Sequence, residues 1–315
     1  MSLDRERVLE ILERFGSLKV LVVGDVILDR YVFGKVERIS PEAPVPVVEV
    51  QKEEFRLGGA GNVANNLANL GVKTSLLGLV GQDYGRHIVR GLLKRGGEDL
   101  MVEDPERPTT EKMRVVALSQ QLLRVDSESK KAVEGRVLEK LLQRLEVEVD
   151  GIVVSDYAKG VVCRELMDRV RERKLFFSVD PRPQNGNLYV GAGLMTPNER
   201  EAKSMLQEEN LQSLGWRLKR ELRLGTLVIT LGQRGMALFD RDFKVFPARA
   251  RQVYDVSGAG DTVVAVLTAC ALSGVDWDTA CELANLCAGI VVGKLGTAVA
   301  KPEEILQSFE EGCRV

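Results

Sequence analysis

The segment 255–262, Asp-Val-Ser-Gly-Ala-Gly-Asp-Thr, places two glycines and two carboxylates directly before an apolar run at 263–272. If residues 258–261 form the first turn of a helix, their backbone N–H groups lack intrahelical acceptors and point the positive end of the helix dipole at one position. That position would hold an anion, and the glycines would let the backbone approach it closely. Asp261 could then take a proton from a hydroxyl group that attacks the anion. The alternative is an ordinary core helix with Ser257 as its N-cap.

Polar residues also follow other apolar runs that are typical of buried strands. The first run, 19–24, is followed by Asp25 and Asp29, whose carboxylates could accept hydrogen bonds from sugar hydroxyls. A turn or capping role is the alternative, and it weighs as much as sugar binding for Asp25 and less for Asp29. Comparable positions hold Asn198 and Glu201, then Thr230, Gly232 and Gly235, and, where a helix opens, Gly58, Gly59 and Asn62. For that last group, packing of a loop on the helix is nearly as good an explanation as ligand binding.

The elements that must position these residues alternate along the chain. From residue 133 to 232 the pattern is one of repeated βα units, with a polar residue at the carboxyl end of each strand. It predicts an α/β fold with a doubly wound, mostly parallel sheet flanked by helices, whose one edge gathers the polar residues. Such an edge suits a sugar kinase, because phosphoryl transfer needs mainly positioning and charge neutralisation. No low-complexity linker divides the chain, so we expect a single domain over residues 1–315.

Two segments, approximately 31–56 and 108–126, do not follow the βα pattern. The first contains Pro41, Pro44 and Pro46, and the second alternates apolar with charged or polar residues. Proline favours an edge or exposed strand. We therefore expect the two segments to form a small antiparallel sheet that stands off the main domain as a lid and keeps water from the transfer site.

The composition excludes several classes of function. With 44% hydrophobic residues, 29% charged residues and a formal net charge of -2, the chain is typical of globular proteins and has no basic surplus for nucleic acid. It has neither a signal-peptide pattern nor an apolar run long enough to span a membrane. Five cysteines form no CxxC pair, and together these features predict a reduced, cytoplasmic protein. His87 is the single histidine, which excludes a multi-histidine metal site.

The motifs together resemble the ribokinase family, the PfkB-type carbohydrate kinases, over nearly the whole chain. The resemblance lies in Gly58-Gly59 with Asn62, Thr196-Pro-Asn-x-x-Glu201, Thr230-Leu-Gly232 and above all residues 255–261, in the family's order. Segments 24–31, 38–47, 155–160 and 293–297 further resemble the branch of that family that phosphorylates heptose 7-phosphates. The resemblance implies a ribokinase-like fold and ATP-dependent phosphorylation of D-glycero-β-D-manno-heptose 7-phosphate at its C1 hydroxyl, in the synthesis of ADP-heptose for lipopolysaccharide.

The resemblance also implies a role for each motif. It implies ATP and Mg²⁺ as cofactors, and it leaves activation by a monovalent cation open. The small, apolar segment 285–294 would line the adenine site, and its alternative, a buried helix, is compatible with that role. The residues implied are Asp261 as the base; Gly258, Ala259 and Gly260, with the amide of Asp261, as the anion hole; Asp25, Asp29, Gly58, Gly59 and Asn62 for the sugar; Asn198, Thr230, Gly232, Gly235 and Asn285 for ATP; and Glu201, Asp255 and, through water, Asn198 for Mg²⁺.

A substrate that already carries a phosphate needs cationic partners, for which arginine suits a bidentate contact better than lysine does. A solvated lid face is the alternative for each candidate. An exposed pair of strands is a poor surface for a monomer, so we expect a homodimer joined through the lids, as the resemblance also implies. The candidate cations are Lys112, Arg114 and Arg124 in the lid and Lys159 and Arg182 at strand ends.

Many fused relatives carry a nucleotidyl-transferring domain with a histidine-containing signature after the kinase. This chain ends at Val315 and has only His87, so we expect a separate adenylyltransferase to act downstream.

Other functions fit parts of the pattern. A sibling kinase for another sugar, such as fructose 1-phosphate or ribose, would keep all the motifs. A non-catalytic sugar or nucleotide binding protein would keep the fold, although the intact Asp261 argues against it. A Rossmann dehydrogenase is disfavoured because the first strand is followed by no Gly-x-Gly-x-x-Gly turn.

Overall fold

Nine strands among the described residues, which are 3–93, 97–118, 120–248 and 253–311, form the central sheet of this computed structural model. Seven neighbouring strands of this sheet run parallel, so their carboxyl ends share one edge, and the other two strands add antiparallel pairing at one side. The expected mostly parallel sheet is confirmed. In spatial order the strands are β15 (Phe243–Phe246), β14 (Met236–Phe239), β13 (Thr226–Thr230), β12 (Leu194–Met195), β11 (Phe176–Asp180), β10 (Gly151–Ser155), β1 (Lys19–Gly24), β4 (Lys73–Leu77) and β6 (Gly97–Asp99).

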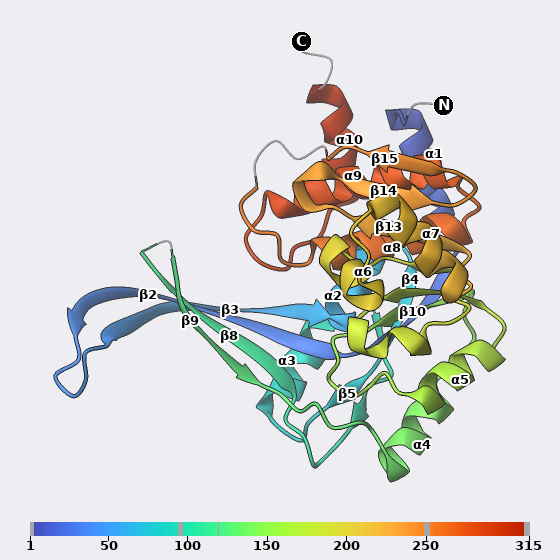
Figure 1. The fold of residues 1–315 in the computed structure, drawn as a ribbon. Helices are drawn as coiled ribbons and strands as arrows, with labels where there is room; N and C mark the ends of the chain where they lie inside the picture. Colours follow the sequence, from blue (N-terminus) through green and yellow to red (C-terminus); the bar gives the residue numbers. More distant parts are fainter. Residues whose placement is uncertain (1–2, 94–96, 119, 249–252, 312–315) are drawn as a thin grey trace.

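Helices cover both faces of this sheet (Figure 1). Alternate residues of β1 enter two separate apolar cores, with Val20 and Val22 in one and Leu21 and Val23 in the other, as expected for a central parallel strand. The first core contains residues of α1 (Arg5–Phe15), α2 (Ala60–Asn69), α3 (Tyr84–Leu93), α8 (Ala259–Leu272), α9 (Trp277–Val292) and α10 (Pro302–Glu311). The second contains residues of α4 (Gly135–Arg144), α5 (Arg164–Glu172), α6 (Glu199–Leu206) and α7 (Leu211–Glu221).

Helix α8 has no solvent-facing stripe over most of its length. Every residue from Asp261 to Cys270 is buried. A helix buried on all sides must be apolar on all sides, which explains the continuous apolar run that the sequence shows after the glycines. No helix in the described part of the chain is both long and apolar enough to cross a membrane.

A second sheet projects from the main body as a long, thin ribbon (Figure 1). Its strands, in spatial order, are β3 (Pro46–Gly59), β2 (Val26–Ile39), β8 (Thr110–Ala117) and β9 (Gln120–Ser127). A small parallel pair, β5 (Leu79–Val80) and β7 (Val102–Glu103), forms a two-stranded sheet of its own. Two short 3₁₀ helices, η1 (Pro183–Leu188) and η2 (Gly232–Arg234), follow β11 and β13.

The second sheet corrects two expectations. It is mixed rather than antiparallel, because β2 pairs in parallel with β8 while β2–β3 and β8–β9 are antiparallel. The long crossover between β2 and β8 allows both strands to leave the main body in the same direction. The first strand also begins at Val26 instead of near residue 31, so Asp29 lies within β2 and not at the end of a main-sheet strand. Ser119, in the second expected segment, lies outside the described residues.

Candidate active site

The N-terminus of α8 has the geometry of an anion site. Gly258 is its N-cap, with φ of 80° in the left-handed region, and no side chain caps the helix. The alternative of a Ser257 cap is therefore wrong. The N–H of Ala259 donates to the carbonyl of Val256 (3.3 Å), which corrects the expectation that it belongs to the anion hole. The N–H groups of Gly260 and Asp261 find no acceptor among the described residues, so they are the donors that an anion would meet.

Asp261 is buried in the first turn of α8, with 2% of its surface exposed. Its Oδ2 accepts a hydrogen bond from Nδ2 of Asn62 (2.7 Å), and its Oδ1 accepts one from the hydroxyl of Tyr157 (2.9 Å). Burial raises the pKa of Asp261 to about 6, while the two hydrogen bonds act in the opposite direction. A carboxylate with such a pKa is ionised at neutral pH and is basic enough to take a proton from a hydroxyl.

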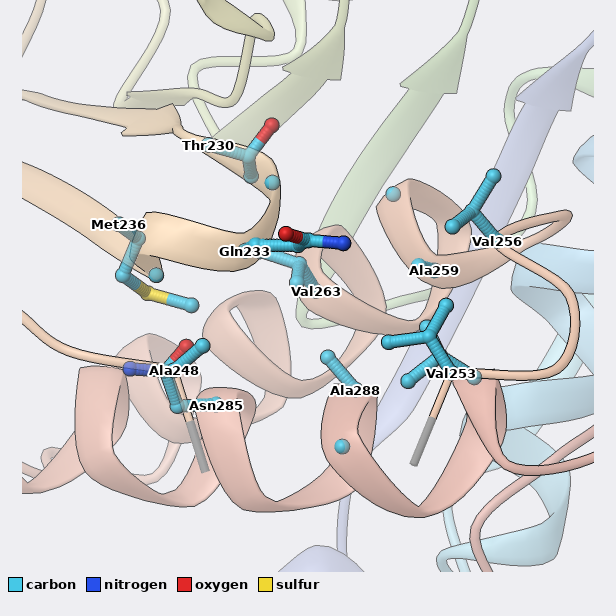
Figure 2. Close-up of a pocket in the computed structure, with 15 residues that line it drawn as sticks. Thr230, Gln233, Met236, Ala248, Val253, Val256, Ala259, Val263, Asn285 and Ala288 are labelled. Atoms are coloured by element: carbon cyan, nitrogen blue, oxygen red, sulfur yellow. The ribbon is translucent and has the colours of Figure 1, made fainter. Parts of the chain in front are cut away.

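A pocket of about 420 Å³ lies beside this helix start (Figure 2). Most of its walls are apolar, with a few polar side chains among them, as is usual for sites that bind small molecules. The amide of Asn285 lines it and donates to the carbonyls of Phe246 and Pro247 (both 3.1 Å), which fixes that wall. The predicted nucleotide residues Thr230, Gly232, Gly235 and Asn285 line the pocket together with Ala259 and Gly260, whereas Asn198 and Gly258 are not among its lining residues.

The two aspartates that follow β1 have different surroundings. Asp25 accepts hydrogen bonds from the backbone N–H groups of Tyr157 (2.7 Å), Lys159 (3.0 Å) and Val161 (3.3 Å). Burial, followed by repulsion from Asp156, raises the pKa of Asp25 to about 6. The structure thus favours the alternative for Asp25, since its carboxylate accepts three backbone hydrogen bonds that hold a loop in place.

Asp29, on β2, contacts a cation of the neighbouring strand β8. Its Oδ1 forms a largely buried ion pair with Arg114 (2.5 Å). A Cβ at Gly58 would lie 2.4 Å from Oδ2 of Asp29, and one at Gly59 would lie 2.4 Å from the carbonyl of Asp25. Both glycines therefore have a packing reason, because β3 must approach these residues more closely than a side chain would allow.

The five candidate phosphate-binding cations differ in their partners. Besides Arg114, which pairs with Asp29, three of them have carboxylate partners: Arg124 with Asp126 (2.8 Å), Lys159 with Glu128 (2.5 Å) and Arg182 with Glu201 (2.7 Å). Lys112 alone of the five has no carboxylate partner among the described residues. Its ammonium lies 5.6 Å from the ring centre of Tyr157, and burial lowers its pKa.

The expected metal-binding residues form hydrogen bonds of their own. Asn198 and Glu201 make a capping box at the start of α6, in which each side chain accepts a hydrogen bond from the other residue's backbone N–H (both 2.9 Å). Both oxygens of Asp255 accept backbone hydrogen bonds, from Ser257 (2.9 Å) and Gly296 (2.8 Å), which argues against direct coordination by Asp255. The described residues contain no group of three or more His, Cys, Asp or Glu side chains arranged to bind a metal directly.

The sequence interpretation missed several residues of the site. Tyr157 follows a strand end within segment 155–160, and its aromatic ring beside polar residues was an available signal. Asp180 ends β11, and burial followed by the negative charge of Asp261 raises its pKa well above the usual value. Arg56 donates to the carbonyl of Leu295, so it ties β3 to the loop that holds Asp255. No local pattern marks Arg56, since its partner is 239 positions away.

Residues 17–304 match the pfkB family of carbohydrate kinases. The chain belongs to this family. It is 45% identical over 304 residues to the D-beta-D-heptose 7-phosphate kinase of Bordetella bronchiseptica, an alignment that covers 93% of this chain and 96% of that protein. It is 43% identical over 306 residues to the bifunctional protein HldE of a Nitratiruptor species, covering 94% of this chain. The kinase spans 66% of the length of that bifunctional relative, slightly less than two thirds.

Solved structures share the fold of this kinase at low sequence identity. Phosphofructokinase-2 from Escherichia coli, in complex with potassium, superposes with a TM-score of 0.78 at 16% identity, covering 94% of this chain and 100% of that one. Ribokinase from Arabidopsis thaliana, complexed with ribose and ATP, gives a TM-score of 0.69 at 16% identity, covering 93% and 99%. These similarities establish the ribokinase-like α/β fold.

Proposed function

We propose that this kinase transfers the γ-phosphoryl group of ATP to the C1 hydroxyl of D-glycero-β-D-manno-heptose 7-phosphate. The observation that carries the proposal is that the buried carboxylate of Asp261 directly follows Gly260. The backbone N–H of Gly260 has no acceptor among the described residues and can bind an anion. Asp261 accepts the proton of the sugar hydroxyl while the N–H groups of Gly260 and Asp261 stabilise the charge of the phosphoryl group in transfer. The substrate is proposed by analogy with the named Bordetella relative, which matches along almost its whole length.

The pocket residues fit an adenine nucleotide. Its volume of about 420 Å³ and apolar walls suit an adenine ring between α9 and the loop after β13, with the phosphates directed toward Gly260. Mg²⁺ bound to those phosphates supplies neutralisation of the triphosphate charge. We propose that Glu201 and Asn198 hold it through water, since their side chains are already used in the capping box and oxygen ligands suit this ion.

We propose that the second sheet acts as a lid over the sugar and presents the cations for its phosphate. Lys112 is the strongest candidate, because a partially buried ammonium without a carboxylate partner gains most from an incoming phosphate. Arg114 follows, with its guanidinium shared with Asp29. Arg124 is the weakest of the lid cations, since half of its side chain is exposed. We propose that residues 1–315 work as one domain with this lid attached.

The lid also supports a proposed homodimer. Leu123 and Val125 alternate on β9 and remain 49% and 46% exposed, and Val50 on β3 is 57% exposed. Apolar residues on an exposed sheet favour burial against a second copy. A Leu123→Lys variant should shift the protein toward monomer in light scattering. A wild-type protein that is monomeric at micromolar concentration would refute the dimer.

We propose a cytoplasmic location, where ATP is available. It is consistent with free thiols at Cys163, Cys270, Cys281 and Cys287, while Cys313 lies outside the described residues. We further propose that an adenylyltransferase acts downstream, because conversion of a sugar bisphosphate to a nucleotide sugar requires nucleotidyl transfer.

The test is a coupled ADP-release assay with ATP and Mg²⁺, with and without K⁺, over heptose 7-phosphate, fructose 6-phosphate, fructose 1-phosphate, ribose and adenosine. We expect heptose 7-phosphate to give the highest kcat/KM. Preference for another sugar would retain the kinase and reject the heptose assignment. Asp261→Asn should lower kcat by about 10²–10⁴-fold with substrate binding retained, and retained turnover would reject its role as the base.

A further inference from the structure

We infer that Tyr157 is a positioning residue for Asp261, which orients the base through its hydroxyl and connects it to the lid through its ring. The inference rests on the proposed role of Asp261 as the base. Nothing in the sequence motifs assigns Tyr157 a part in the reaction, yet its hydroxyl donates to Oδ1 of Asp261 at 2.9 Å across 104 positions of sequence.

The two hydrogen bonds on Asp261 fix the plane of its carboxylate. Asn62 holds Oδ2 and Tyr157 holds Oδ1, so rotation of the carboxylate would break at least one buried bond. Asn62 is itself held, because Nδ2 of Asn66 donates to its Oδ1 (3.3 Å) and its backbone carbonyl (2.9 Å). One lone pair on each carboxylate oxygen remains for the substrate hydroxyl.

The backbone of Tyr157 is anchored by the buried carboxylate of Asp25. That group accepts hydrogen bonds from the N–H groups of residues 157, 159 and 161, which gather the loop after β10 against the end of β1. Only 1% of Asp25 is exposed. Movement of the Tyr157 backbone would therefore disrupt buried hydrogen bonds to a carboxylate, and this gives Asp25 a place in positioning the base.

Two cations from different elements flank the ring of Tyr157. The guanidinium of Arg182, after β11, lies 4.5 Å from the ring centre, and the ammonium of Lys112, on the lid strand β8, lies 5.6 Å from it. Both distances are within the range of cation–π attraction. A substrate phosphate that binds Lys112 would therefore change the contact between Lys112 and the ring of Tyr157. Because Tyr157 orients Asp261, binding of the sugar phosphate is connected to the alignment of the base.

The charged groups that face Asp261 come from several elements. Asp29 on β2 and Asp180 at the end of β11 raise the energy of its ionised form, and Arg182 lowers it. The hydroxyl of Tyr157 also favours the ionised form, because a donor to a carboxylate stabilises its charge. Loss of that donor should therefore raise the pKa of the base.

The experiment compares Tyr157→Phe with wild type in the pH dependence of kcat/KM for the sugar phosphate, using the full chain. Phe keeps the ring and its two cations and removes only the hydroxyl. We expect the acid limb to move up by about 1 pH unit, kcat at neutral pH to fall, and KM to change by less than about twofold. An unmoved limb, or a change confined to KM, would overturn the inference.

Tyr189→Phe is the matched control. Its hydroxyl donates to Asp156 (2.6 Å) and not to Asp261, so this variant should lose thermal stability without moving the acid limb. A Tyr157→Leu variant removes the ring as well and should also raise KM, whereas Tyr157→Phe should keep KM close to that of the wild type. If Asp261→Asn retains turnover, the base assignment and this inference both fail; if Asp261→Asn is inactive but Tyr157→Phe leaves the limb in place, only this inference fails.

Discussion

A Gly260→Ala substitution should reduce the activity of this kinase without reducing its stability. A Cβ at Gly260 would meet no heavy atom within 4 Å, its backbone is already helical, and the residue lines the nucleotide pocket. Alanine is the better helix former by up to about 1 kcal/mol, so the folded protein should be equally or more stable. The new methyl group would enter the space proposed for the phosphates and displace the transferred group, for which about 1 Å of misplacement can reduce the rate about 10²-fold.

Alanine at Gly258 makes the matched comparison, because it should damage both properties. Gly258 has φ of 80°, and a Cβ there would lie 2.6 Å from Nδ2 of Asn62, the group that holds Asp261. Left-handed strain costs about 1–2 kcal/mol and a disrupted buried hydrogen bond about 1–3 kcal/mol. Together these costs lower the free energy of unfolding by about 2–5 kcal/mol. Because the entropy of unfolding scales with chain length, that loss lowers Tm by about 3–8 °C.

The assay is ADP release at saturating sugar over a range of ATP concentrations, combined with thermal unfolding. For Gly260→Ala we expect kcat/KM for ATP to fall by about 10²-fold while Tm is unchanged or rises by about 1–2 °C. Full activity of Gly260→Ala would refute the anion site at the start of α8. A large drop in its Tm would instead show that the space beside Gly260 is not open.

Two further predictions follow from buried charge. Burial raises the pKa of Asp261 to about 6, and the reaction needs the ionised form of this carboxylate. We therefore expect kcat/KM for the sugar to be constant above about pH 6 and to fall about tenfold for each pH unit below it. A fall in kcat/KM that begins only near pH 4 would contradict the burial argument. Arg114→Met should lower the free energy of unfolding by about 3–5 kcal/mol in urea titration, because it leaves the buried carboxylate of Asp29 without its ion pair. Arg124→Met, which removes only an exposed pair with Asp126, is the control and should change stability little.

Several features of the site could be predicted because their causes are local. An apolar run after Gly-Ala-Gly-Asp predicts a buried helix whose first turn carries the glycines, and α8 begins at Ala259. The repeated βα units predict the parallel sheet, since apolar strands of this kind are stable only between two layers of helices. The order of strands and the polar residues at their ends then bring the N-terminus of α8 and the loop after β13 to one pocket.

The capping alternative failed at the start of α8, whereas the expected first turn at residues 258–261 agrees with the observed helix start to within one residue. Serine is a preferred N-cap residue, yet the cap is Gly258, because the chain enters α8 through a left-handed conformation that glycine adopts without strain. The direction of β8 was also mispredicted, because alternation of side chains marks a strand and carries no information on whether its neighbour is parallel.

The sequence by itself determined the elements of this protein, the helix start that offers free N–H groups and the carboxylate placed beside them, since each depends on residues within a few positions of one another. Only the tertiary structure decided what those groups contact. Asp261 meets Asn62 and Tyr157 from 199 and 104 positions away, and the carboxylate of Asp25 accepts a backbone hydrogen bond from Tyr157 in the loop after β10. The physical reason is that a buried polar group must be satisfied by whichever partner the packed strands and loops bring within hydrogen-bond distance, and that partner is set by topology and register.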